Sequence, residues 1–140
     1  MIIITVTGIE QLIPLIHKLS LEHFLPYILD VIEWELWRLA IMIQQNPDIP
    51  PEYKLSLFLW RNDETGQVGL GVYMPEEMEW LRFGRVLKYK EYVCPVRKYF
   101  GGALTLAWTG PDYIKELWLQ EKDKILNNIK QYIVRWLMQR

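Results

Sequence analysis

Residues 22–45 read EHFLPYILDVIEWELWRLAIMIQQ and predict one long helix near the centre of the chain. Apolar residues recur at spacings of three and four along one side of this helix, at Phe24, Ile28, Val31, Ile32, Leu36, Leu39 and Ile43. Further apolar residues occupy its other sides, at Leu25, Leu29, Trp34, Trp37 and Ile41. A helix that is apolar on more than one side must be covered on more than one side. We therefore expect several elements, or other copies of the chain, to pack around it.

The residues that flank this helix predict where it begins and ends. Ser20 can cap its amino terminus, because a serine side chain accepts hydrogen bonds from the free N–H groups of a first turn. Residues 46–51 contain three prolines, which cannot continue a helix. We expect the helix to run from the residues after Ser20 to Gln45.

The remaining segments predict a short series of strands and helices. The β-branched run at residues 2–6 indicates a strand, and the hairpin pattern after the long helix indicates two more, because a polar loop separates two apolar runs. The expected elements are a strand at 2–6, a helix at 9–19, strands at 53–60 and 67–74 joined by a loop at 61–66, a helical turn at 75–81, a strand around 89–93, a further strand at 103–108, and a helix from 109–111 to the carboxyl terminus.

Together these elements predict an α+β fold, in which a small antiparallel sheet packs against long helices, including a long C-terminal helix. The length of 140 residues indicates one domain, over residues 1–140. Residues 85–102 are expected to form an extended arm or loop on that domain. The strand at 53–60 is apolar on both faces, so we expect both faces of the sheet to be covered.

Composition indicates a folded protein with more large rings than a small core requires. Hydrophobic residues make up 51% of the chain and aromatic residues 14%, including seven tryptophans and eight tyrosines. These rings either fill a core that is poor in alanine or become buried only in an oligomer, because aromatic side chains are favoured at interfaces.

The charge is balanced overall but uneven along the chain. The net charge of −1 gives no general attraction to nucleic acid or anionic lipid. Residues 82–98, however, include six basic residues and only one acidic residue, Glu91, so this segment has a charge of +5. This basic stretch is either a solvated face, or a rim that meets an acidic neighbour or passing DNA.

No arrangement of reactive residues indicates an enzyme. His17 and His23 do not share a helix face, and Glu76 and Glu79, which could share one, fit the acidic first turn of a helix. Cys94 has no companion thiol and reads as a small buried hydrophobic residue. We expect no catalytic, cofactor-binding or metal-binding residues.

No apolar run reaches the roughly 18–20 residues of a membrane span, and the opening lacks the features of a signal peptide, so we expect a cytoplasmic protein without membrane contact.

Three short stretches resemble a family of bacteriophage proteins. Residues 4–12 read ITVTGIEQL, a strand followed by a glycine and a hydrophobic-acidic-x-Leu helix start. Residues 80–84 read WLRFG, and residues 111–114 read PDYI at the start of the last helix. In this order the stretches resemble the tail-completion, or minor tail, family of lambda-like tailed phages, which is also called the gene product ten family. The chain departs from the family pattern at Arg82, where an acid is usual, and at Glu52-Tyr53, where the family has Thr-Gly.

The resemblance implies a structural protein of the virion, assembled in the host cytoplasm into a ring at the head–tail junction. Such a ring, sixfold or twelvefold, completes the tail and joins it to the connector, with the tail tube or terminator and DNA in the lumen as further neighbours. A tail terminator ring is the near alternative, and a small metal-dependent nuclease or a dimeric adaptor is a distant one. Because Trp, Tyr and Arg dominate interface hot spots, the candidate interface residues are Trp34, Trp37, Arg85, Tyr92, Arg97, Tyr99 and Phe100.

Overall fold

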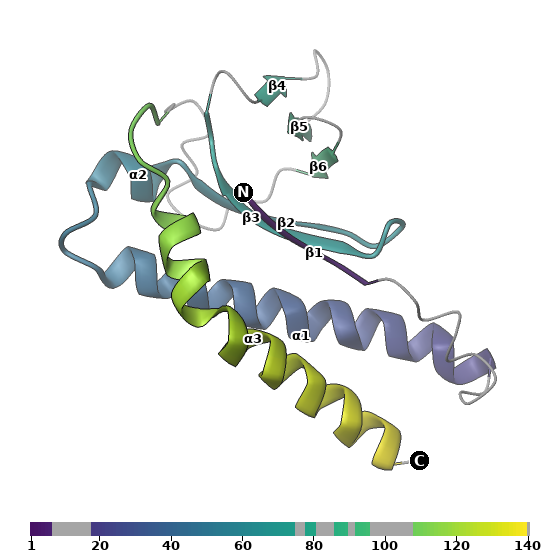
Figure 1. Ribbon diagram of the computed structural model, residues 1–140. Coiled ribbons are helices and arrows are strands. Elements are labelled where there is room, and N and C mark those ends of the chain that lie inside the picture. The colour runs from purple at the N-terminus through teal and green to yellow at the C-terminus, as the bar shows by residue number, and fades with distance from the viewer. Residues whose placement is uncertain (7–17, 75–77, 81–85, 90–91, 96–107, 140) are drawn as a thin grey trace.

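The computed structural model describes residues 1–6, 18–74, 78–80, 86–89, 92–95 and 108–139. A three-stranded sheet lies at the centre of these residues (Figure 1). The helices α1, Lys18–Gln45, and α3, Tyr113–Met138, lie on one side of it, and a second three-stranded sheet lies on the other. The predicted α+β class, with a small antiparallel sheet and a long C-terminal helix, is confirmed.

The central sheet has the order β1-β3-β2, from β1, Ile2–Thr5, β3, Gln67–Val72, and β2, Leu57–Asn62. All pairs are antiparallel, and the register places Trp60 opposite Gly69. The hairpin loop between β2 and β3 closes because Asn62 Oδ1 accepts hydrogen bonds from Glu64 N and Thr65 N, at 3.1 and 3.3 Å. Gly66 then adopts a φ of 68°, a conformation that glycine reaches without strain.

Both faces of the central sheet are covered, as the sequence predicts. Side chains alternate along β2, so Leu57 and Leu59 join the core under α1. Phe58 and Trp60 point the other way and form a second cluster with Cys94 of the outer sheet. Cys94 is fully buried there, which confirms its expected role as a small hydrophobic residue.

Helix α1 supplies most of the helical core. Its buried stripe includes Phe24, Ile28, Ile32, Leu36, Leu39 and Ile43. Helix α3 packs along α1, and the Phe24 and Trp136 rings meet with their centroids 4.6 Å apart. The expectation that Ser20 caps α1 is wrong, because the helix already includes Lys18. No helix in the described ranges is both long enough and apolar enough to cross a bilayer.

The predicted strand at 53–60 is wrong in its first part. Residues Pro51–Leu55 form a short helix, α2, and the strand begins only at Leu57. The residues after Pro50 suit a first helical turn, because Pro51 needs no N–H partner there and Glu52 is an acid near the positive end of the helix dipole. The helix-starting residues Pro51 and Glu52 therefore decide the structure of residues 51–55, and the alternation of apolar residues decides it only from Leu57 on.

The second sheet corrects two further predictions. It consists of β4, Met78–Trp80, β5, Val86–Tyr89, and β6, Tyr92–Pro95, in the order β4-β5-β6. The sequence predicts a helical turn at 78–80 and an arm with one strand at 85–102, but antiparallel pairing makes 78–80, 86–89 and 92–95 strands. Pro95 is tolerated because it is the last residue of its strand. Of the expected helix at 9–19, residues 18–19 belong to α1 and residues 9–17 lie outside the described residues. The arm beyond residue 95 and residues 103–107 of the strand expected at 103–108 also lie outside them.

Candidate interaction surface on helix α1

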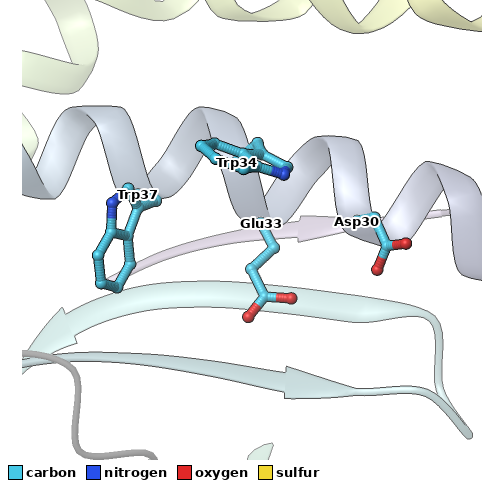
Figure 2. Close-up of a pocket in the computed structure, with 4 residues that line it drawn as sticks. All are labelled: Asp30, Glu33, Trp34 and Trp37. Atoms are coloured by element: carbon cyan, nitrogen blue, oxygen red, sulfur yellow. The ribbon is translucent and has the colours of Figure 1, made fainter.

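A pocket of about 400 Å³ opens along the exposed side of α1 (Figure 2). Its described lining residues are Asp30, Glu33, Trp34 and Trp37. Their spacing of three and four places them on one face of the helix. We call this surface the α1 groove. The groove therefore combines two indole rings with two carboxylates along two turns of helix.

The two tryptophans of the groove differ in burial. Trp34 is 68% exposed, whereas Trp37 is half-buried and packs against the main core. Figure 2 shows the Trp37 ring and the Glu33 carboxylate directed toward the strands, whereas the Trp34 ring lies across the helix and is not directed toward them. An exposed indole gains nothing from the core of its own chain, and such rings are enriched at protein interfaces.

Arg61 of β2 organises the carboxylates of the groove. Its Nη1 donates to Asp30 Oδ1 and, at 3.2 Å, to Glu33 Oε2, while its Nε donates to Asp63 Oδ1. Burial lowers the pKa of Arg61, but the hydrogen bonds to Asp30, Asp63 and Glu33 outweigh it and raise the pKa above its ordinary value. The guanidinium is therefore always charged, and these four described side chains, three acids and one base, have a formal net charge of −2.

The chemistry of the groove suits a cationic side chain. A lysine or arginine can place its charge against an indole face and its N–H groups on carboxylate oxygens. Within the described residues, no group of three or more His, Cys, Asp or Glu side chains could hold a metal ion. The groove is therefore a candidate surface for a basic partner.

Helix α3 carries a second exposed apolar surface. Leu119, Leu126 and Leu137 are exposed, and their spacings of seven and eleven residues place them on one helix face. Val134 and Met138 extend this surface at the end of the helix. We call these five residues the α3 stripe.

The PDYI stretch forms a structural corner at the start of α3. Asp112 caps the helix, with its Oδ1 accepting from Ile114 N at 3.2 Å. The Tyr53 hydroxyl of α2 donates to the same Oδ1 at 3.1 Å and accepts from Ile114 N at 2.8 Å. Burial, and then the nearby charge of Asp112, raise the pKa of Tyr53 above its ordinary value. This motif therefore serves the fold, by fixing α3 to α2.

The structure brings together two of the predicted interface residues. Trp34 and Trp37 share the α1 groove, while Tyr92 is exposed in β6, on the opposite side of the central sheet. Arg85, Arg97, Tyr99 and Phe100 lie outside the described residues.

Sequence reasoning missed the acidic half of the groove and the α3 stripe. The spacing of Asp30 and Glu33 relative to the two tryptophans is a signal that could have found the first pair. Arg61, by contrast, lies 31 residues from Asp30 and 28 from Glu33, so only the fold reveals the cluster. Leu119 and Leu126 stand one heptad apart, which was a readable sign of the stripe.

Comparison with known proteins finds no matching family model, no matching curated protein and no matching solved structure.

Proposed function

We propose that this chain is a structural protein of a tailed bacteriophage virion, which forms a ring at the head–tail junction, completes the tail and joins it to the connector. The observation that carries the proposal is that one chain exposes two different apolar surfaces, Trp34 at the α1 groove and the α3 stripe. The resemblance of residues 4–12, 80–84 and 111–114 to the tail-completion family supports the same role.

Two different surfaces are what a ring requires of each subunit. In a ring each copy contacts its neighbours head to tail, so one patch meets a different patch on the next copy. A twofold dimer needs only one self-complementary patch. A chain with an exposed indole on one helix and an exposed leucine stripe on another is suited to the first arrangement.

A tail terminator ring would use the same kind of contact, and we keep it as the alternative within this class. The nuclease alternative depended on Glu76 and Glu79 sharing one helical face. Glu79 belongs to strand β4, so that helical pairing does not apply. Under the proposal the chain needs no cofactor and is located in the virion.

The proposal can be tested by removing the chain from the phage genome that would encode it. We expect DNA-filled heads and free tails to accumulate without joining, as seen in electron micrographs. Adding the purified wild-type chain to such an extract should restore joined, infectious particles. Normal numbers of joined particles in its absence would overturn the proposal, and tails of uncontrolled length would favour the terminator alternative.

A further inference from the structure

We infer that a pocket between helices α1 and α3 binds a carboxylate, and we call it the α1–α3 pocket. It has a volume of about 220 Å³, and every described residue that lines it carries a polar or charged group. These residues are Glu35, Arg38, Asn128, Gln131, Tyr132 and Arg135. The inference does not depend on the proposed ring.

The packing of two helices forms the pocket. Glu35 and Arg38 are three residues apart on α1, and the four lining residues of α3 recur at spacings of three and four, so each set lies on one helix face. The two helices pack along each other, which brings these faces together (Figure 1). The pocket is therefore built on two packed helices rather than on a loop.

Glu35 positions one of the two arginines of the pocket. Its side chain is buried, and Arg38 Nη1 donates to both of its carboxylate oxygens at 3.2 Å. Within the part of the chain that the structure describes, Arg38 makes no other side-chain hydrogen bond, so its Nε and Nη2 groups remain available as donors. The buried carboxylate thus holds one guanidinium at the pocket and leaves most of its N–H groups for a ligand.

Tyr132 positions the other arginine. The Arg135 Cζ atom lies over the Tyr132 ring, 5.7 Å from its centroid, which is within the range of a cation–π contact. Such a contact uses the face of the guanidinium and leaves its N–H groups free, and no carboxylate among the described residues pairs with them. Guanidinium groups match a carboxylate with two parallel hydrogen bonds. The side-chain amides of Asn128 and Gln131 add further donors to the same pocket.

Charge favours a carboxylate over a phosphate group in this pocket. The two arginines and Glu35 give the described lining residues a formal net charge of +1. One carboxylate balances that charge. A phosphate monoester carries a charge of about −1.5 to −2 at pH 7, and the excess negative charge would face Glu35. Glu35 therefore serves both to orient Arg38 and to discriminate between the two anions.

Titration of the full chain with sodium acetate at constant ionic strength tests the inference. Binding is followed by the NMR signals of the arginine Nε–H groups and by the rise in melting temperature that a bound ligand causes. The blocked peptide Gly-Glu-Gly presents the same group as an acidic side chain, and Gly-Gln-Gly is its uncharged control. Inorganic phosphate is the competing anion.

Arg135→Gln is the main variant, because Arg135 is exposed and its loss leaves no buried charge unpaired. Lys130→Gln is the matched control, since it removes the same charge from an exposed position of α3 outside the pocket. Glu35→Gln keeps one oxygen for Arg38 and raises the formal charge of the lining residues from +1 to +2. Arg38 is left unchanged, because its removal would leave a buried carboxylate without its partner.

We expect acetate and the glutamate peptide to shift the signals of both pocket arginines until they saturate, and the glutamine peptide to have no effect. Arg135→Gln should weaken acetate binding by about tenfold, because it removes hydrogen bonds between charged groups. Lys130→Gln should leave the affinity unchanged. Glu35→Gln should improve the affinity for phosphate relative to acetate by about tenfold or more.

Three results would overturn the inference. They are the absence of any saturating shift at the highest soluble acetate concentration, equal losses in Arg135→Gln and Lys130→Gln, and tighter binding of phosphate than of acetate by wild type. If the site is supported, peptide binding about tenfold tighter than acetate binding identifies an acidic side chain of another protein as the source of the carboxylate. Equal affinities identify a small free carboxylate. The native mass of the chain tests the ring separately, so either proposal can fail without the other.

Discussion

Trp60 and Trp34 show how differently two regions of this molecule use the same side chain. Trp60 of β2 is 0% exposed, lies over Gly69 and directs its indole Nε1 at Met1 Sδ, 3.1 Å away. Trp34 of α1 is 68% exposed at the edge of an acidic groove. The core among the described residues closes without Trp34. Under the proposed function, a neighbouring copy in the ring would cover this indole.

Replacing Trp60 with alanine is the strongest way to test the buried half of this comparison. Trp60→Ala removes a fully buried ring between the two sheets, and we expect it to lower the free energy of unfolding by about 3–5 kcal/mol. Urea denaturation of the purified chain measures the change. A loss below about 1 kcal/mol would mean that the outer sheet does not depend on this cluster.

Gly69→Ala tests whether Trp60 requires a residue without a side chain opposite it. A Cβ atom at Gly69 would lie 2.3 Å from Trp60 Nε1, so the ring or the strand must shift. We expect a loss of about 1–3 kcal/mol in urea denaturation. Gly71→Ala is the matched control, since its Cβ would meet Phe58 Cζ at 3.1 Å, and it should cost less. Equal losses would contradict the close approach.

Tyr53→Phe tests a second buried aromatic residue, which stabilises the fold through the hydrogen bonds of its hydroxyl group. The hydroxyl bonds both Asp112 Oδ1 and Ile114 N, and we expect its removal to cost about 1 kcal/mol in urea denaturation. Tyr132→Phe, on the exposed side of α3, is the control and should cost almost nothing.

The same tyrosine predicts a loss of stability at high pH. Its pKa in the folded chain is raised above the ordinary value of 10.0, so the folded state keeps a proton that the unfolded state loses. Stability is therefore full below pH 10 and falls as the pH rises above it. The measurement is thermal unfolding at about pH 8 and about pH 11, on either side of the ordinary tyrosine pKa of about 10. The melting temperature should fall between these pH values in wild type and fall less in Tyr53→Phe. Identical curves would remove Tyr53 as the cause.

Trp34→Ala should have the smallest effect on stability, and this result would sharpen the comparison most. An exposed ring contributes little to folding, so we expect a change within about 0.5 kcal/mol. Self-association, measured by light scattering, should weaken by about tenfold or more, as for an interface hot spot. A variant that unfolds easily, or that associates like wild type, would contradict the role assigned to this ring.

The sequence contained enough information for the helices and the hairpin, but not for every strand. The periodic stripe in residues 22–45 was readable because burial on one face of the helix enforces it. The apolar run after Ser56 was readable because both faces of β2 are buried. Residues 78–80, 86–89 and 92–95 become strands through pairing with one another, which no local pattern required. Helix α2 was missed because the proline at its start outweighs the alternation of Tyr53 and Leu55.

The candidate site was predictable only in part, for a related reason. Aromatic richness in α1 indicated Trp34 and Trp37, whereas the acidic character of the groove depends on Arg61 reaching across from β2. Arg61 is 31 positions from Asp30 and 28 from Glu33, so these ion pairs exist only in the tertiary fold. The residue types were therefore enough to predict Trp34 and Trp37 as candidates. Only the packing shows that Trp34 stays exposed and Trp37 does not.

The central claim is that the exposed surfaces of this chain serve a head-to-tail assembly. The most direct measurement is the native mass of the wild-type chain by light scattering, combined with electron-microscope images of the same sample. The account predicts a closed ring with sixfold or twelvefold symmetry. A stable dimer with twofold symmetry would contradict it, because such a dimer joins one surface to itself and leaves the other uncovered.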